Sequence, residues 1–462
     1  MSHSPIFEQL ETAGLVRGGE VNVTKLAATS ISDLLELAEQ AAEVTSAASL
    51  EQERTSFAHT ASLELGGGPS PCVEIGCRIG HADQLARYAA LYGDRIYTNC
   101  FFADHVAHAD SAMRANPETV RSRMKDDLAV LLHLRPLIEA GRVIPVTPPR
   151  NHCPHCLSIH TTFDEDTLRR LNAVTDHVAR RHLREVEVIV ERIGPRYFVR
   201  LKGPEDLLEH GGGGIIFDQI PDGLRSDPRL VARIHHGGPI KLTRSQRLAL
   251  GTHKREAEKI RQNLVFELSV CQCLGTSLLT SNQLDVDLLT AISQDAVIAK
   301  RNALIQRHLT AIVPFLEELD VRDLLELRTK EADSFIFFRG ALSKAISDTS
   351  ANGADFTEER ARQIYGDVLA PQLAGLDLKM AGARRAFRKT TGRRIVGWVG
   401  AISFGAFTGI LPAGLVAAAQ ALGLTKVLAD STEAAMTLSD AEESIRSDEM
   451  YFLWRLRKLA KR

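Results

Sequence analysis

The sequence lacks an excess of charge of either sign. Its 462 residues include 56 lysines and arginines and 58 aspartates and glutamates, so the formal net charge at pH 7 is −2. A protein that binds nucleic acid over a broad surface needs a clear positive excess. The composition therefore excludes a globally basic protein, and we do not expect nucleic acid as a partner.

Cysteine is scarce and odd in number. Seven cysteines in a chain of this length do not form the dense, paired pattern of a disulfide-stabilised secreted protein. A secretory signal is also lacking, because Glu8, Glu11 and Arg17 interrupt the stretch that would have to be its apolar core. We therefore expect a cytoplasmic location, with association with the inner membrane as an alternative that depends on one C-terminal segment.

The best-known catalytic signatures are absent. The chain contains no phosphate-binding G-x-x-x-x-G-K-[ST] loop, no H-E-x-x-H zinc motif and no G-x-S-x-G nucleophile turn. The glycine run Gly66–Gly68 precedes the first strand expected below, which is the wrong order for a dinucleotide-binding loop. The sequence therefore names no reaction, and whether the protein is an enzyme stays open.

Length predicts more than one folding unit, since the chain is about three times as long as a typical domain of roughly 150 residues. The pattern predicts an α/β N-terminal half, with a small, mostly parallel sheet and a β-hairpin, followed by a mainly α-helical C-terminal half. The expected divisions are an N-terminal helical segment at 1–66, an α/β domain at 67–203, a glycine- and proline-rich loop region at 204–252 and a helical domain at 253–462.

Alternating strand and helix patterns predict the parallel sheet. The expected strands are Cys72–Ile79, Arg95–Phe102 and Val143–Thr147, and the helices between them are Ala82–Tyr92 and Pro117–Ala140. A helix over Ile31–Arg54, capped by Ser30 or Ser32, precedes the sheet. The segments expected after it are a helix over Asp166–Leu183 and a hairpin of the strands Glu185–Ile193 and Arg196–Lys202.

The remainder of the chain is expected to be helical. Leucine and phenylalanine recur at helical spacing in His253–Cys273, Asp287–Leu319, Asp320–Ser347 and Glu358–Lys389. Asp320 suits the N-cap of its helix. The short apolar stretch Thr276–Thr280 is compatible with one further strand.

A cluster of cysteine and histidine predicts a metal site. Cys153 and Cys156 form a C-x2-C knuckle, and His177 and His182 follow on the expected helix after twenty intervening residues. Two thiolates and two imidazoles form a ligand set for structural Zn²⁺, although the usual gap is roughly 12–15 residues. Zinc is therefore the expected cofactor, and the alternative is unliganded thiols. Other donors that could replace either histidine are His152, His155, His160 and the pair Cys271 and Cys273.

The tetrapeptide Cys153-Pro154-His155-Cys156 resembles the active-site motif of the bacterial periplasmic thiol oxidases of thioredoxin fold. The resemblance covers these four residues and implies redox catalysis by the two thiols. The sequence departs from that family, because it lacks an export signal and because Ser158–Asp164 lacks the helical periodicity that should follow the motif. A metal site is therefore the preferred interpretation.

Charged residues and histidines stand at the ends of the expected strands. The first strand runs into Arg78, His81 and Asp83, and the second into Asp104, His105, His108 and Asp110. Ligands of open parallel sheets bind beyond the carboxyl ends of the strands, where such groups can hold a divalent metal or act as acid and base on a phosphoester. A metal-dependent phosphoesterase or nuclease is thus an alternative function. In the competing interpretation, Asp83 and Asp104 are helix N-caps, and His105 and His108 are surface residues.

The segment Ile395–Thr425 contains no charged residue. A helix needs about 20 apolar residues to span a bilayer, and small residues every fourth position, from Gly397 to Gly409, favour close helix pairing. A basic cluster at 384–394 lies just upstream and suits anionic lipid. Pro412 leaves two interpretations open, which are a membrane-embedded helix and a hairpin buried within the helical half.

The final segment, Met450–Arg462, has the pattern of a basic amphipathic helix with aromatic residues. Such a helix suits a membrane interface, but it equally suits docking onto a helical bundle. We prefer docking, because the segment is rich in aromatics.

These features favour a two-part binding or effector protein. A metal-capable α/β head would sense a partner, and the helical C-terminal half would oligomerise or associate with a membrane. The expected partners are therefore a membrane surface or the inner membrane, and further copies of the chain. Two other classes compete with it: the metal-dependent hydrolase described above, and a zinc protein that binds nucleic acid, which the near-zero net charge opposes.

Overall fold

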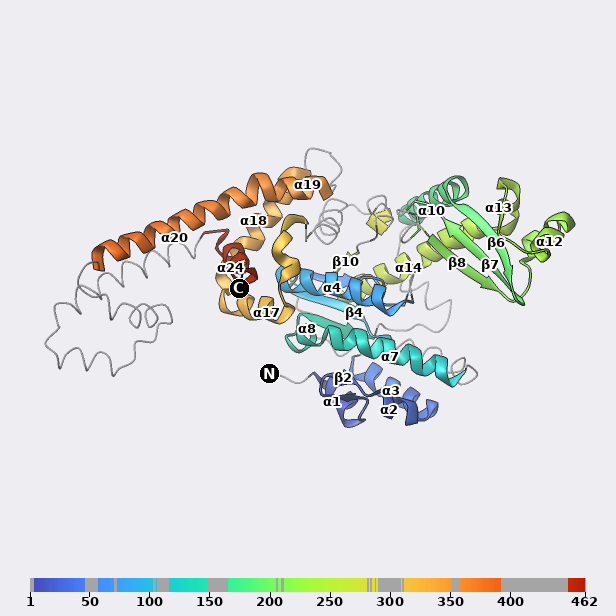
Figure 1. Ribbon diagram of the computed structural model, residues 1–462, viewed down its shortest axis with the longest axis horizontal. Coiled ribbons are helices and arrows are strands. Elements are labelled where there is room, and N and C mark those ends of the chain that lie inside the picture. Colours follow the sequence, from blue (N-terminus) through green and yellow to red (C-terminus); the bar gives the residue numbers. More distant parts are fainter. Residues whose placement is uncertain are drawn as a thin grey trace. The chain divides into compact units, whose positions relative to one another are not determined.

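The computed structural model divides the chain into two compact units, Met1–Arg307 and His308–Arg462 (Figure 1). The residues that it describes are 4–45, 57–69, 73–102, 105, 116–147, 165–204, 207–208, 212–280, 282, 285–286, 288–289, 309, 311–350, 358–391 and 448–461. In these ranges the first unit contains a parallel sheet, an antiparallel sheet and helices, whereas the second is helical. The predicted fold class is confirmed.

The chain begins with short helices. They are α1 (Pro5–Thr12), α2 (Val23–Ala28) and α3 (Ile31–Val44), and the two-residue strands β1 (Val16–Arg17) and β2 (Glu20–Val21) lie between α1 and α2. The Ser30 hydroxyl accepts a hydrogen bond from the backbone N–H of Asp33, so Ser30 is the N-cap of α3. This confirms the helix predicted from Ile31 as far as Val44, and residues 46–56 lie outside the described part.

Four parallel strands form the first sheet, in the order β10-β3-β4-β5. They are β3 (Ala58–Ala61), β4 (Arg95–Asn99), β5 (Val143–Val146) and β10 (Ser277–Leu279). The helices α4 (Ile75–Leu91), α7 (Pro117–His133) and α8 (Arg135–Glu139) connect β3 to β4 and β4 to β5. The strands predicted at the positions of β4, β5 and β10 are confirmed.

The first strand of this sheet was predicted in the wrong place. Cys72–Ile79 does not form a strand, because α4 begins at Ile75 and buries Arg78, Ala82 and Leu85 at helical spacing. The alternation of Val73 with Ile75 imitates a strand, yet Val73 is 69% exposed. The true strand, β3, reads Ala-His-Thr-Ala, which carries little β propensity, and its burial between two neighbouring strands makes it a strand.

The second sheet is antiparallel, in the order β8-β7-β6-β9. The central strands β6 (Glu187–Ile193) and β7 (Arg196–Lys202) form the predicted hairpin, with Ile193 opposite Arg196. Gly194 has a φ of +60° at the turn, a conformation that glycine adopts without steric cost. The hairpin prediction is therefore confirmed.

The stretch expected to be a loop region is structured where it is described. It contains β8 (Gly212–Phe217), α11 (Asp222–Arg225), α12 (Pro228–His235), β9 (Ile240–Lys241) and α13 (Arg244–Leu250). Capping residues and glycines mark where these short helices begin and end. Asp227 caps α12, Thr243 forms a capping box with Gln246, and Gly251 ends α13 with a φ of +72°. The high glycine and proline content marks turns between short elements here.

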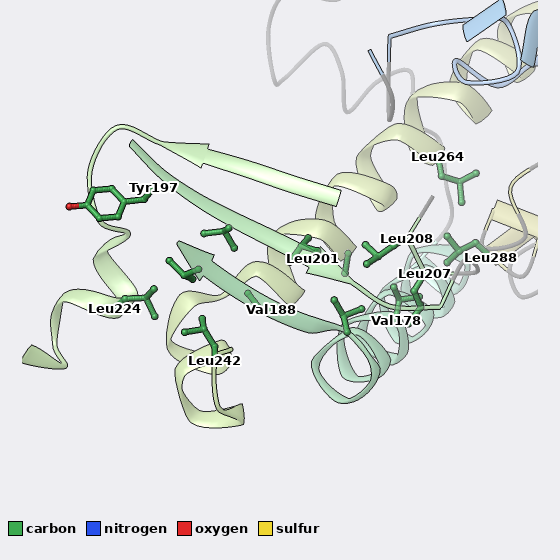
Figure 2. Close-up of a cluster of buried hydrophobic side chains, with 14 of the residues drawn as sticks. Val178, Val188, Tyr197, Leu201, Leu207, Leu208, Leu224, Leu242, Leu264 and Leu288 are labelled. Carbon is green, nitrogen blue, oxygen red and sulfur yellow. The ribbon is translucent and has the colours of Figure 1, made fainter. Parts of the chain in front are cut away.

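One face of the antiparallel sheet is covered by α10 (Glu165–Glu185) and α14 (Thr252–Leu274). Figure 2 shows this core, in which Val188 of β6 and Leu201 of β7 lie on the same side of the sheet as Val178 of α10 and Leu264 of α14. Alternate residues along β6 and β7 are buried, as a sheet covered on one face requires.

Helix α14 contributes to the cores of both sheets. Its 23 residues correspond to a length of about 35 Å. Ala257 and Leu264 belong to the core of the antiparallel sheet, whereas Val270 and Leu274 pack against Tyr97 and Val146 of the parallel sheet. The second half of α14 thereby lies against the parallel strands.

The second unit consists of helices in its described ranges. They are the 3₁₀ helix η3 (Pro314–Glu318), α17 (Val321–Lys330), α18 (Ala332–Ser350), α19 (Glu358–Gln363), the π-helix η4 (Ile364–Leu369), α20 (Ala370–Thr391) and α24 (Tyr451–Ala460). Asp320 accepts a hydrogen bond from the N–H of Arg322, which confirms the predicted cap.

The C-terminal helix α24 packs against this bundle, as preferred from its sequence. Phe452 is 5.2 Å, centroid to centroid, from Phe335 of α18, and the indole N–H of Trp454 donates to Asp377 of α20 at 2.9 Å. Five residues of α24, from Tyr451 to Leu456, are buried. The segment Ile395–Thr425 lies outside the described residues. Within the described ones, no helix is both long and apolar enough to cross a membrane.

Candidate functional site at the strand ends

A pocket lies where the parallel strands end. Three strands contribute their last residues to its lining, namely Thr60 and Ala61 of β3, Tyr97, Thr98 and Asn99 of β4, and Val146 of β5. Leu63 of the following turn and Phe266, Glu267 and Val270 of α14 complete it. Its volume is about 310 Å³, including the part open to solvent. Open α/β sheets bind ligands at this end of their strands.

The position of Glu267 follows from the apolar face of α14. Leu264, Glu267, Cys271 and Leu274 recur at intervals of three and four residues, so they share the buried face of the helix. The packing of Val270 and Leu274 against Tyr97 and Val146 fixes this half of the helix against the sheet. This packing holds Glu267 at the strand ends and keeps its side chain away from water.

Glu267 is buried, with 6% of its surface exposed. Its Oε1 accepts a hydrogen bond of 2.8 Å from the backbone N–H of Leu63. Burial and the neighbouring carboxyl groups of Asp285 and Glu64 raise the pKa of Glu267 well above its usual range. The protonated, neutral form of Glu267 is therefore favoured over the carboxylate more strongly than in an exposed glutamate.

Of the neighbouring charges, Asp285 has the largest effect on the pKa of Glu267. It accepts a hydrogen bond of 2.9 Å from the Thr280 hydroxyl, just beyond β10. Removal of its carboxyl group from water raises the pKa of Asp285 to about 6. Because each charge disfavours the other, Glu267 and Asp285 titrate as a pair.

Behind the pocket the polar groups are paired with one another. The hydroxyls of Thr60 and Thr276 lie 2.6 Å apart and join β3 to the start of β10. Burial raises the pKa of the adjacent Cys271 thiol to about 12, so it is not a thiolate nucleophile near neutral pH. His59 faces the other side of the sheet, where its Nδ1 lies 2.8 Å from Ser277 Oγ. With 1% of its surface exposed, His59 serves as a packing group.

The glycine run Gly66–Gly68 follows β3 and precedes α4. This order is the opposite of the one predicted, because the first strand was misplaced, and it is the order found in dinucleotide-binding loops. The N–H groups nevertheless donate within the turn, from Gly66 to Ser62, Gly67 to Glu64 and Gly68 to Leu63. A Cβ at Gly67 would lie 2.6 Å from a methyl group of Val130. The glycines therefore permit a tight turn, and these N–H groups do not form a cradle for an anion.

A buried ionic network fixes this turn. Arg78 Nη2 lies 2.5 Å from Asp127 Oδ1, and His105 Nε2 lies 2.7 Å from Asp127 Oδ2. Arg78 Nε also donates to the carbonyl of Gly67 at 2.8 Å. All three side chains are at most 4% exposed. The network positions the turn that contributes Leu63 to the pocket, and it is itself closed to ligands.

The residues predicted at the strand ends are dispersed. Arg78, His81 and Asp83 lie on α4, since the strand before them does not exist. Asp83 lies inside the helix, 2.8 Å from Arg87, so it is not an N-cap either. His105 is buried against Asp127, which contradicts a surface position. Asp104, His108 and Asp110 lie outside the described residues.

The residues predicted to bind zinc are placed in part. Cys153 and Cys156 lie outside the described residues, whereas His177 and His182 lie on α10. His177 is exposed and His182 is buried, because five residues correspond to about 140° around a helix. His182 Nε2 has no hydrogen-bond partner within the described ranges. Burial lowers the pKa of His182 to about 4, which keeps the ring neutral.

No three or more histidine, cysteine or acidic residues come together as a metal site in the part of the chain that the structure describes. His177 and His182 therefore do not converge on one ion by themselves. Sequence reasoning also missed Glu267, although a signal was present. It is a carboxylate inside the apolar stripe of a predicted helix, and glutamate is rarely buried in a core unless it is paired.

Comparison with protein-family models, with curated proteins and with solved structures gives no match for this chain.

Proposed function

We propose that the first unit binds a small organic molecule in the strand-end pocket and acts as the sensing head of a two-part binding or effector protein. The observation that carries the proposal is the buried carboxyl group of Glu267 in a pocket lined by the ends of three parallel strands. A buried acid with a strongly raised pKa costs stability, and such groups gather at functional sites.

The composition of the pocket supports this proposal. Ligand sites combine a mainly apolar lining with a few polar groups that orient the ligand. Here Thr98, Asn99 and Glu267 accompany apolar residues of both α14 and the strands. The enclosed part of the pocket, about 20 Å³, is far smaller than a typical ligand site, so we expect a small ligand that stays partly open to solvent.

A fragment screen by ligand-observed NMR tests the proposal. Val270→Trp should fill the pocket from the α14 side and abolish the saturable hits of the wild-type protein. Val23→Trp is the matched control, because Val23 lies on α2 and is 54% exposed. An absence of saturable hits, or equal binding by both variants, would contradict a ligand site at the strand ends.

We further propose that the second unit is the effector half and that it oligomerises or associates with a membrane through Ile395–Thr425. The absence of charge over this segment and the basic cluster before it support the proposal. Membrane fractions washed with salt and then with carbonate test it, since an inserted helix resists both. Light scattering of the purified protein separates oligomers from monomers. A monomer found wholly in the supernatant would rule out both modes.

Zinc remains the proposed cofactor, held by Cys153, Cys156, His182 and His177. The neutral ring of His182, whose Nε2 has no hydrogen-bond partner among the described residues, supports its assignment, whereas the exposed position of His177 makes it the weaker ligand. Metal analysis of the purified protein and of Cys153→Ser tests the site. We expect His182→Ala to lower the zinc content more than His177→Ala does. A stable, metal-free wild type would end the proposal.

The catalytic alternative, a metal-dependent phosphoesterase or nuclease, gains no support from its described residues. Asp83 is paired with Arg87, and His105 is buried against Asp127. A comparison of the wild-type protein with Asp104→Ala in the presence of Mg²⁺ or Mn²⁺ measures any such activity. Equal background from both proteins would remove this alternative.

A further inference from the structure

The strand-end pocket carries acidic charge and no basic charge in its described lining. Glu267 is the one side chain with a carboxyl, ammonium, guanidinium or imidazole group among the lining residues. Asp285 and Glu64 oppose its ionisation, which shows that both contribute negative potential there. His81 Nε2 lies 3.3 Å from Glu64 Oε1, and His81 is not part of the pocket lining. An anionic ligand would therefore meet repulsion in this pocket.

The nearest source of anion-binding groups does not compensate for this. The N–H groups of Gly66, Gly67 and Gly68 donate to carbonyls of their own turn, as described above. The guanidinium of Arg78 is committed to Asp127 and to the carbonyl of Gly67. A phosphate or carboxylate group at the strand ends would thus lack the donors that it requires.

The remaining walls suit a cation with an apolar body. Phe266 lines the pocket and is 38% exposed, so part of its side chain is open to a ligand, whereas Tyr97 lines the pocket but is only 4% exposed. Aromatic faces attract ammonium groups. An ammonium group carries three donors, and the oxygen atoms of Thr98, Asn99 and Glu267 lie in the same lining. Val270 offers apolar surface beside them.

We infer that the pocket binds a small primary amine, with the ammonium group against the Glu267 carboxylate and the apolar part against Phe266 and Val270. This inference rests on the proposed function and specifies its ligand class. A cation beside a buried carboxyl group offsets its charge and favours the carboxylate. Amine binding should therefore shift Glu267 from acid towards carboxylate, and the proton that Glu267 loses goes to the solvent, without any change in covalent bonds of the ligand.

The same groups determine how binding depends on pH. The titratable groups around Glu267 are Cys271 on α14, Asp285 beyond β10, Glu64 of the turn after β3, His81 of α4 and Tyr97 of β4. The acids lose protons as the pH rises, so the affinity for an amine should increase over the range in which Glu267 and Asp285 ionise. A neutral ligand would show the opposite trend, because it uses the protonated acid as a donor.

Three probes with the same ring and a similar chain test the charge assignment: phenethylamine, 2-phenylethanol and 3-phenylpropionate. Calorimetry and ligand-observed NMR measure their binding to the full chain. We expect saturable binding of phenethylamine alone, with proton release detected as a difference between two buffers of unequal ionisation enthalpy. Glu267→Gln should weaken phenethylamine binding at least tenfold. Glu258→Gln, the same change on the same helix but outside the pocket lining, should leave it unchanged.

A second variant keeps the test valid if Glu267→Gln does not fold. Phe266 is partly exposed, so Phe266→Ala should fold, and loss of its ring should weaken phenethylamine binding about two- to fivefold. Unchanged affinity in both variants would overturn the inference. Binding of Mg²⁺ in competition with phenethylamine would also overturn it, because the acids would then form a metal site.

The outcomes also separate this inference from the proposed function. Binding of 2-phenylethanol or 3-phenylpropionate that Val270→Trp abolishes would overturn the amine assignment and leave the pocket as a ligand site. Failure of all three probes, together with an empty fragment screen, would overturn both. Binding of phenethylamine that survives Val270→Trp would place the amine elsewhere and overturn the inference.

Discussion

Removal of the charge of Asp127 should destabilise the first unit strongly. Asp127→Asn keeps the shape of the side chain but leaves the Arg78 guanidinium without its counter-ion, and both side chains are only 2% exposed. The loss of one partner of a buried ion pair costs about 3–5 kcal/mol. The free energy of unfolding of a protein domain is about 5–15 kcal/mol, so this unit would lose a large part of its stability.

A double variant separates the lost charge pair from lost shape. Replacement of a whole buried ion pair by apolar residues is often neutral, so Arg78→Met combined with Asp127→Leu should recover part of the loss. His105 would still lack the acceptor that it has at 2.7 Å, and a buried unpaired donor costs about 1–3 kcal/mol. The double variant should therefore be less destabilised than Asp127→Asn by about 2 kcal/mol.

Asp83→Asn is the control for this series. Asp83 pairs with Arg87 on α4, but 35% of its side chain is exposed, and such pairs contribute less than about 1 kcal/mol. Tryptophan fluorescence would not report on the first unit, because both tryptophans, Trp398 and Trp454, belong to the second. Hydrogen exchange of peptides from α4 and α7 measures the opening free energy directly. Equal effects of Asp127→Asn and Asp83→Asn, or no recovery in the double variant, would refute the reasoning.

Three further predictions concern the same unit. Gly67→Ala should lower stability by about 2–4 kcal/mol, because φ is +80° and Val130 lies in the way, whereas Gly141→Ala, with φ +66° and open space, should cost about 1 kcal/mol; equal shifts in urea unfolding would show that the turn is loosely packed. Iodoacetamide at pH 8 should label Cys77 before Cys271, whose pKa is raised to about 12; early labelling of Cys271 in peptide mass spectra would contradict its burial. Because the pKa of Asp285 is raised to about 6 in the folded protein, the free energy of unfolding should fall as the pH rises from about 4 to about 6. Asp285→Asn should make this fall smaller; an unchanged dependence on pH would show that Asp285 ionises normally.

The elements that were predicted correctly have local causes. Ser30 and Asp320 cap their helices through hydrogen bonds within three residues of the chain. The hairpin of β6 and β7 combines an alternating pattern with a glycine at the turn, so neighbouring residues suffice to specify it. The C-terminal helix carries its aromatic face in its own sequence, and that face is buried.

The elements that were missed depend on distant residues. β3 is a strand because β4 and β10 flank it, and its own residues, Ala58–Ala61, give no strand signal. The error at Cys72–Ile79 followed from this, since a strand was needed before α4 and the only apolar alternation lay there. For the same reason, Gly66–Gly68 was predicted to precede the first strand, whereas it follows β3.

The candidate site shows the same division. The rule that ligands bind at the carboxyl ends of parallel strands led to the edge of the sheet where the pocket lies, but to residues that do not line it. Glu267 lies more than 160 positions after Asn99 in the sequence and meets it through the packing of α14 on the sheet. Asp285, which raises the pKa of Glu267, follows β10, the strand of this sheet that comes last in the sequence.

The amino-acid sequence alone determined the class of fold, the hairpin and the helix caps of this protein, because these depend on propensities and hydrogen bonds between residues close in the chain. Tertiary structure alone decided which residues surround the strand ends, since burial, pairing of distant strands and the raised pKa of Glu267 arise only when separate segments exclude water together.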